Sequence, residues 1–131
     1  MLWCADGCAV WIGTIVVADD SMVIRKIVSH YLSANNCTHH VCSDGDEAWK
    51  WIQQHSSICA ALITDLEMPK MGGDTLVTLM RESYPNIPCF IVSGKDMSLD
   101  IPEGARRAIV KPITSEQVLS LLDEVASLQS C

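Results

Sequence analysis

The sequence has few basic residues, and this scarcity excludes one broad class of function. Nine Lys and Arg residues stand against sixteen Asp and Glu residues, so the 131-residue chain has a formal net charge of −7 at pH 7. Nucleic acids and anionic lipid surfaces are bound through basic faces. The sequence also lacks an apolar run of the roughly 20 residues that a membrane-spanning helix needs. We therefore expect that this domain neither binds nucleic acid directly nor associates with a membrane.

The sequence contains no CxxC pair, although it has seven cysteines, at positions 4, 8, 37, 42, 59, 89 and 131. An odd number of scattered cysteines is not the pattern of a disulfide framework or of a zinc site. Cys42, Cys59 and Cys89 lie in or beside expected strands, where a free thiol packs as a small apolar residue. We interpret His39-His40 as the start of a strand rather than as a metal site. This cysteine usage favours a reducing compartment, the cytoplasm.

The first 13 residues, MLWCADGCAVWIG, are apolar but contain no Lys or Arg, and Arg25 is the first basic residue of the chain. They therefore lack the positively charged start of a secretory signal. We interpret residues 1–13 as an upstream segment, either the trace of a longer parent protein or a remnant of cloning. Residues 14–131 are long enough for one domain with a real core, and 49% hydrophobic residues fit a packed globular domain.

Short apolar runs alternate with amphipathic segments along residues 14–131. Strands that alternate with helices imply right-handed crossovers and a parallel sheet with helices on both faces. Continuous apolar strands, rather than alternating ones, fit burial on both faces. We therefore predict an α/β fold with a five-stranded parallel sheet. The expected strands are 14–18, 39–43, 59–65, 87–94 and 108–110, and the expected helices are 21–32, 44–55, 74–84 and one that starts at the Thr114–Gln117 capping box.

Polar or charged residues follow four of these expected strands. They are Asp19 and Asp20 after the first strand, Asp65 after the third, Ser93 at the fourth and Lys111 after the fifth. The carboxyl ends of parallel strands lie along one rim of the sheet, where ligands bind in such folds. We therefore expect these five side chains to gather at the same place.

Such a group of side chains suits a particular chemistry. Crowded carboxylates have raised pKa values unless a cation lies among them. Oxygen ligands favour a hard ion, and Mg²⁺ bound through one or two carboxylates and several waters fits them. An acid nucleophile, Mg²⁺, a hydroxyl and a lysine together suit phosphoryl transfer onto a carboxylate.

Residues 14–128 resemble the receiver domains of two-component response regulators. The matching motifs are the acid pair in VVADDS (16–21), the loop DLEMPKMGG (65–73), VSG (92–94) and KP (111–112), in the order of the family. Each motif is weak alone, but the combination is specific. The resemblance implies a flavodoxin-like doubly wound fold with strand order 2-1-3-4-5 and a cis bond before Pro112.

The resemblance also implies a role for each site residue. Asp65 is the expected phosphoacceptor, and Ser93 and Lys111 are expected to contact the phosphoryl group. The expected ligands of Mg²⁺ are the carboxylates of Asp19, Asp20 and Asp65 and the backbone carbonyl of Glu67.

By the same resemblance, the phosphoryl group comes from a histidine kinase or a histidine phosphotransfer protein, and its arrival changes partner interactions. Such a module catalyses only its own phosphorylation and dephosphorylation and is not an enzyme in the usual sense. A kinase or effector domain could be fused to it.

The sequence departs from the family at two places. Ala108 stands three residues before Lys111, where receivers usually carry Tyr or Phe. The distance from Ser93 to Lys111 is also several residues shorter than usual, and the intervening residues show little helical periodicity. We therefore expect the helix that the family has between the fourth and fifth strands, its fourth helix, to be short, irregular or missing here. We also expect the family's usual conformational response at this helix to be muted or rerouted.

Two charged residues could modulate the lifetime of the phosphoryl group. Glu67 lies two residues after Asp65, and Lys95 lies two residues after Ser93. Either the two side chains close over the site and obstruct the water that attacks an acyl phosphate, or they are solvated charges that never meet.

A phosphohydrolase of the haloacid-dehalogenase kind is the alternative function. That family also uses an Asp nucleophile, Mg²⁺, a hydroxyl and a Lys, with a second acid two positions after the nucleophile. Glu67 has this spacing from Asp65. However, the Asp19-Asp20 pair and the loop after Asp65 fit that family poorly, and the chain leaves no room for a substrate cap.

Overall fold

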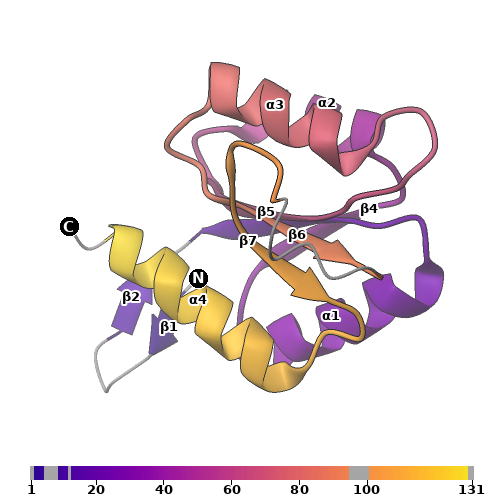
Figure 1. Ribbon diagram of the computed structural model, residues 1–131. Helices are drawn as coiled ribbons and strands as arrows, with labels where there is room; N and C mark the ends of the chain where they lie inside the picture. Colours follow the sequence, from indigo (N-terminus) through magenta and orange to yellow (C-terminus); the bar gives the residue numbers. More distant parts are fainter. Residues whose placement is uncertain (1, 5–8, 12, 95–100, 130–131) are drawn as a thin grey trace.

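The computed structural model describes residues 2–4, 9–11, 13–94 and 101–129. Five parallel strands form the central sheet in the order β4-β3-β5-β6-β7 (Figure 1). Counted along the chain from Thr14, this order is 2-1-3-4-5, which confirms the predicted doubly wound α/β fold. The strands are β3 (Thr14–Ala18), β4 (His39–Cys42), β5 (Cys59–Asp65), β6 (Cys89–Ser93) and β7 (Ala105–Val110).

Helices cover both faces of the sheet. Helices α1 and α4 lie on one face, and α2 and α3 lie on the other (Figure 1). The helices are α1 (Met22–Ala34), α2 (Gly45–His55), α3 (Gly73–Ser83) and α4 (Ser115–Gln129). No helix in the described part of the chain combines the length and the apolar character that crossing a membrane would need.

Helices α2 and α4 begin where the sequence places capping residues. The side chain of Asp44 accepts a hydrogen bond of 2.8 Å from the N–H of Glu47 at the start of α2. Thr114 and Gln117 form the expected capping box before α4: each side chain accepts a hydrogen bond from the other residue's N–H, at 3.2 and 2.9 Å. Such side chains satisfy N–H groups that the helix leaves unpaired, which fixes where the chain leaves the sheet.

The central strands are buried because helices pack on both sides of them. Every residue of β3, β5 and β6 is buried. Successive side chains of a strand point to opposite faces, so Ile15 and Val17 pack with α1 and α4, whereas Val16 and Ala18 pack with α2 and α3. This explains why these strands are continuous apolar runs in the sequence.

The last strand starts earlier than the sequence analysis predicted. We expected residues 108–110, but β7 runs from Ala105 to Val110 and includes two charged residues. Arg106 and Arg107 pair with Glu124 of α4, with nitrogen–oxygen distances of 2.6 and 3.0 Å. Because these ion pairs to the covering helix pair both charges, two arginines can occupy a strand at the edge of the sheet.

The described part of the connection between β6 and β7 is irregular, as predicted. Gly94 and residues 101–104, the described part of this connection, form bends and turns and no helix. Residues 95–100, which include Lys95 and the rest of the segment where the family has its fourth helix, lie outside the described residues. The bond between Lys111 and Pro112 is cis, as predicted.

The first residues form a separate small sheet. Strand β1 (Leu2–Cys4) pairs antiparallel with β2 (Ala9–Trp11), and Leu2 lies opposite Trp11. The five-stranded sheet begins only at Thr14, whose N–H donates to the carbonyl of Ile58. The division into an upstream segment, 1–13, and a domain, 14–131, stays a prediction.

Candidate functional site

Asp65 is the last residue of β5 and lies at the rim where the strands end. Only 8% of its surface is exposed. Its Oδ1 atom accepts a hydrogen bond of 2.9 Å from the N–H of Leu66, which orients the carboxylate at the exit of the strand. An apolar strand buried on both faces thus ends in a fixed carboxylate at the position where open α/β sheets bind ligands.

Two further acids lie beside Asp65. One carboxylate oxygen each from Asp19, Asp20 and Asp65 can be chosen so that all three lie within 4.8 Å of one another. Asp19 is buried, and its Oδ1 atom accepts a hydrogen bond of 2.9 Å from the N–H of Ser21. Asp20 is exposed and opens the cluster to solvent. The structure therefore brings the three predicted acids together.

Lys111 connects the acids to the opposite side of the rim. Its Nζ atom lies 3.2 Å from Oδ1 of Asp65 and 3.3 Å from Oδ2 of Asp19. Its backbone N–H donates a hydrogen bond of 2.8 Å to the carbonyl of Ser93, which holds the end of β7 beside the end of β6. The side chain is 22% exposed, so the ammonium group lies partly out of bulk water.

The electrostatics of the site favour a bound cation. Burial raises the pKa of Asp65 and Asp19 raises it further; Lys111 and the N–H of Leu66 oppose this rise without cancelling it. Burial lowers the pKa of Lys111, but Asp19 and Asp65 outweigh this effect and hold it above its ordinary value. One ammonium group therefore leaves three carboxylates with an excess of negative charge. An all-oxygen cluster with one exposed member fits Mg²⁺, which prefers oxygen ligands and keeps several waters.

The loop after Asp65 packs closely against the strand that bears it. The N–H of Gly73 donates a hydrogen bond of 2.8 Å to the carbonyl of Leu66. A Cβ atom at Gly73 would overlap the carbonyl oxygen of Asp65. Met68 and Met71 are partly buried and pack against the core between the sheet and helices α2 and α3. Close backbone packing thus positions the start of α3 directly beside the acid.

An open pocket of about 350 Å³ lies over the acid; its lining residues are Asp65, Leu66, Glu67, Ser93, Gly94 and Lys111. Ser93, at the end of β6, is buried. The side chain of Glu67 is exposed beside the pocket. The pocket thus brings together the predicted acceptor, hydroxyl and lysine. Lys95, the expected partner of Glu67, lies outside the described residues.

Ala108 lies on β7 opposite Ile91 of β6. It lines a groove between β7 and α4, together with Arg107, Gln117 and Ser120. The position where the family carries an aromatic side chain is therefore half-buried and holds only a methyl group.

The cysteines in the described core behave as the sequence predicted. Cys37, Cys42, Cys59 and Cys89 are free and buried. Burial raises the pKa of Cys37 to about 11 and those of the other three to about 12, with Glu47 also contributing at Cys42. They are neutral thiols at neutral pH.

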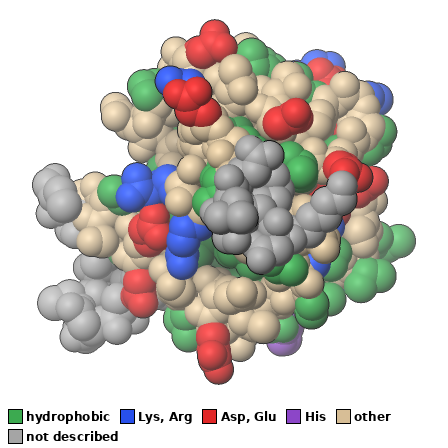
Figure 2. All heavy atoms as spheres, in the orientation of Figure 1, with side chains coloured by type: hydrophobic (Ala, Val, Ile, Leu, Met, Phe, Trp, Pro, Cys, Tyr) green, Lys and Arg blue, Asp and Glu red, His purple; other side chains and the backbone are tan. Residues whose placement is uncertain are grey.

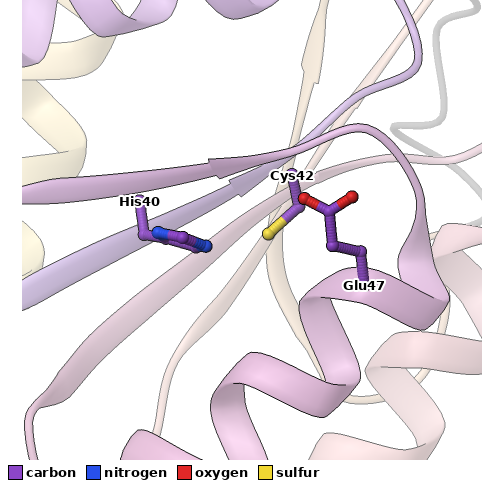
Figure 3. Close-up of side chains that lie close together, drawn as sticks. All are labelled: His40, Cys42 and Glu47. Atoms are coloured by element: carbon purple, nitrogen blue, oxygen red, sulfur yellow. The ribbon is translucent and has the colours of Figure 1, made fainter.

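One group of residues was missed by the sequence analysis. His40, Cys42 and Glu47 lie together on the α2 side of the sheet (Figure 3), and the backbone carbonyl of Cys42 accepts a hydrogen bond of 3.1 Å from the N–H of Asp19. The available signal was the spacing of two strand residues, i and i+2, followed by an acid in the first turn of the next helix.

Comparisons with known proteins agree with the fold. The family model described as the response regulator receiver domain matches residues 15–123. The transcriptional regulatory protein SrrA of Staphylococcus aureus is 28% identical over 109 residues, which cover 80% of this chain and 44% of SrrA. The chain thus spans less than half the length of this curated relative.

Solved structures show the same likeness. The chemotaxis protein CheY4 of Vibrio cholerae is 28% identical with a TM-score of 0.75, covering 87% of this chain and 98% of CheY4. A CheX-CheY complex from Borrelia burgdorferi, with BeF3 and Mg²⁺, contains a chain that is 25% identical with a TM-score of 0.78. That match covers 86% of this chain and 88% of the Borrelia chain.

Proposed function

The chain belongs to the family of response regulator receiver domains, and from this premise we propose that Asp65 accepts a phosphoryl group in a Mg²⁺-dependent phosphorelay. One observation carries the proposal. Asp65 lies at the carboxyl end of the central strand, β5, within a cluster of three carboxylates and 3.2 Å from the ammonium group of Lys111.

The residues of the rim divide the chemistry between them. A carboxylate oxygen of Asp65 attacks the phosphorus atom in line, and the bond between phosphorus and the donor nitrogen breaks with its electrons returning to the donor imidazole. Asp65 then carries an acyl phosphate. The ammonium group of Lys111 and the hydroxyl of Ser93 bind phosphoryl oxygens. When bound by Asp19, Asp20, Asp65 and the carbonyl of Glu67, Mg²⁺ supplies neutralisation of the charge on the transferring group.

The donor and the output are assigned from the family, and the charge bears on which partners the domain binds. We assign a histidine kinase or a histidine phosphotransfer protein as donor, and a change of partner interactions as the result. On the face drawn in Figure 2, acidic side chains are spread among basic ones, and the described residues of this face form no continuous basic surface. Together with the net charge of −7, this supports a domain that does not itself bind nucleic acid or a membrane.

The setting of the domain is part of the same proposal. Residues 14–131 form the receiver domain, residues 1–13 are an upstream segment, and the site works in the cytoplasm. A kinase or effector domain fused to the receiver is part of the proposal, and it is supported by the greater length of SrrA, of which the match covers 44%.

The haloacid-dehalogenase alternative has no support from the family match. Beyond its own phosphorylation and dephosphorylation the domain is proposed to catalyse nothing. It should therefore show no steady-state turnover of phosphomonoesters.

The test is phosphorylation by acetyl phosphate, followed by intact mass. Wild type should gain the mass of one phosphoryl group in Mg²⁺ and none in EDTA. Asp65→Asn should gain none, whereas Asp123→Asn, a control at an exposed acid of α4, should label like wild type. A phosphoryl group that persists on Asp65→Asn, or full labelling in EDTA, would contradict the assignment.

A further inference from the structure

Three side chains with different metal-binding atoms meet beside the start of α2. His40 and Cys42 are two residues apart on β4 and share one face of the strand, and Glu47 lies in the first turn of α2. One imidazole nitrogen, the thiol sulfur and one carboxylate oxygen lie within 4.8 Å of one another. In Figure 3 the sulfur of Cys42 lies between the ring of His40 and the carboxylate of Glu47.

The ring of His40 is positioned by stacking and not by hydrogen bonds. It stacks on the ring of Trp51, with centroids 4.8 Å apart and planes at 15°. Stacking fixes the plane of an imidazole but leaves its nitrogen lone pair, which lies in that plane, available to a metal. Within the described residues, neither nitrogen of His40 has a hydrogen-bond partner. The adjacent His39 has one at each nitrogen, at 2.6 Å to Ser29 and 3.0 Å to Cys37.

The other two groups combine a fixed sulfur with an adjustable oxygen. Cys42 is 1% exposed and is held in the strand. The side chain of Glu47 is exposed, so its carboxylate can move, and the hydroxyl of Ser43 donates a hydrogen bond of 3.1 Å to its Oε2 atom. In a tetrahedral zinc site, ligand bonds of ~2.0–2.3 Å place ligand atoms ~3.5 Å apart. Movements of roughly 1 Å by Glu47 and His40 would bring the three atoms to that spacing.

We propose that His40, Cys42 and Glu47 form a second metal site, which binds Zn²⁺ or a similar borderline transition-metal ion. One nitrogen, one sulfur and one oxygen suit such an ion, whereas Mg²⁺ and Ca²⁺ take oxygen ligands. As the sulfur–metal bond forms, the thiol of Cys42 releases its proton to solvent. Three protein ligands leave the fourth position to water. The hydroxyl of Ser43 is a positioning group, since it orients the carboxylate and does not touch the metal.

This site differs in ligand chemistry from the rim, where the cluster consists of oxygens alone. Excess Mg²⁺ should therefore saturate the rim acids and leave the second site open. The proposal departs from the sequence analysis, which predicted no zinc site because the cysteines are odd in number and form no CxxC pair. The sequence analysis also interpreted His39-His40 as the start of a strand rather than as a metal site. Here the three ligands come from β4 and from the start of α2, so the fold and not a short motif assembles them.

The test uses Co²⁺ as the probe, because thiolate coordination gives cobalt a charge-transfer absorption that oxygen ligands do not give. Titration is done in excess Mg²⁺, on a background in which Cys4, Cys8 and Cys131 are changed to Ser. The expected result is a charge-transfer band that saturates at one equivalent of Co²⁺ and disappears when Zn²⁺ is added. His40→Gln and Glu47→Gln should each weaken Co²⁺ binding by roughly tenfold or more. Cys42→Ser should abolish the band.

Controls keep the result separate from folding and from the phosphoacceptor site. His30→Gln, at an exposed histidine of α1, and Asp65→Asn should bind Co²⁺ like the background protein. Glu47→Gln changes an exposed side chain, so it reports on the site even where Cys42→Ser disturbs the core. A folded background protein with no charge-transfer band would overturn the proposal, as would a band that survives in Cys42→Ser or one that is unchanged in both His40→Gln and Glu47→Gln.

Discussion

The ammonium group of Lys111 lies between two carboxylates, 3.2 Å from Oδ1 of Asp65 and 3.3 Å from Oδ2 of Asp19. Asp65 ends β5, Asp19 directly follows the adjacent strand β3, and Lys111 follows β7 on the other side of β6. A single cation therefore holds three strand ends together but leaves the cluster, which includes Asp20, negatively charged. Several measurable properties depend on this imbalance.

The first prediction concerns stability and pH without metal. The pKa of Asp65 is raised above its ordinary value of 3.8. The folded state therefore binds this proton more tightly than the unfolded state, so the charged carboxylate lowers stability at neutral pH. This penalty is complete above the raised pKa and vanishes as pH falls through the ordinary value. Urea unfolding in EDTA should find Asp65→Asn more stable than wild type at pH 7, with the difference shrinking towards pH ~4.

Saturating Mg²⁺ should reverse that order, because an ion that binds the folded wild type stabilises it by mass action. The control is Asp123→Asn, which should follow wild type in both conditions. A wild-type protein that is already the more stable at pH 7 in EDTA would contradict the electrostatic account.

The second prediction concerns Lys111. Lys111→Met retains most of the apolar stem and removes the charge, so we expect the fold to persist. Acetyl phosphate should label it more slowly by a factor of about 10², as for the loss of one electrostatic stabiliser of a transition state. Its amide NMR shifts should also respond less to phosphorylation than those of wild type. A variant with wild-type labelling and a wild-type shift pattern would show that Lys111 has neither role.

The third prediction concerns the packing of the loop. A Cβ atom at Gly73 would overlap the carbonyl oxygen of Asp65, whereas a Cβ atom at Gly94 meets nothing within 4 Å. Gly73→Ala should destabilise the domain by about 1–3 kcal/mol and slow phosphorylation, because the strain falls on the acceptor residue. Gly94 lines the pocket over Asp65, and Gly94→Ala should change stability by no more than ~0.5 kcal/mol. Equal effects of the two substitutions in urea unfolding would be evidence against a steric role for Gly73.

The fourth prediction concerns the conformational response. A switch needs an element with two packings that the phosphoryl group favours unequally, and the methyl group of Ala108 is too short to be that element. Beryllofluoride should therefore change hydrogen exchange only slightly over residues 101–109. Ala108→Tyr, which adds the family's aromatic side chain beside the groove of β7 and α4, should enlarge the change. Large changes in wild type over this segment would refute a muted switch.

The fifth prediction concerns the lifetime of the acyl phosphate. If Glu67 and Lys95 close over the approach of water, Glu67→Ala and Lys95→Ala should each accelerate dephosphorylation by about tenfold, which corresponds to ~1.4 kcal/mol in the barrier. The double variant should be no faster than either single variant. Unchanged rates in all three would leave the two residues as solvated charges without a role in the lifetime.

The rim could be predicted from the sequence because four of the five strands end in a functional residue or directly precede one. Asp65, Ser93 and Lys111 directly end or follow strands, and the topology alone brings strand ends together. The start of β7 could not be predicted in this way. Arg106 and Arg107 lack the apolar pattern of a strand, and their partner Glu124 lies 18 and 17 residues further along the chain, respectively.

The group of His40, Cys42 and Glu47 was missed for a related reason. The alternation of a strand predicts that His40 and Cys42 share a face, but it does not predict which face or how α2 approaches it. That approach depends on tertiary packing. Gly45, at the start of α2, lies against the backbone of Met71 in the loop after Asp65, where a Cβ atom would overlap the carbonyl oxygen.

The two arginines of β7 have a consequence for the behaviour of the protein in concentrated solution. β7 is an edge strand of the five-stranded sheet, and an open strand edge can add a strand from another molecule and so begin aggregation. Arg106 and Arg107 place two cations in the middle of this edge, tied to Glu124 of the covering helix. A second copy that paired there through its own β7 would bring its arginines alongside these cations. The ion pairs that hold β7 to α4 thus also discourage edge-to-edge growth of the sheet.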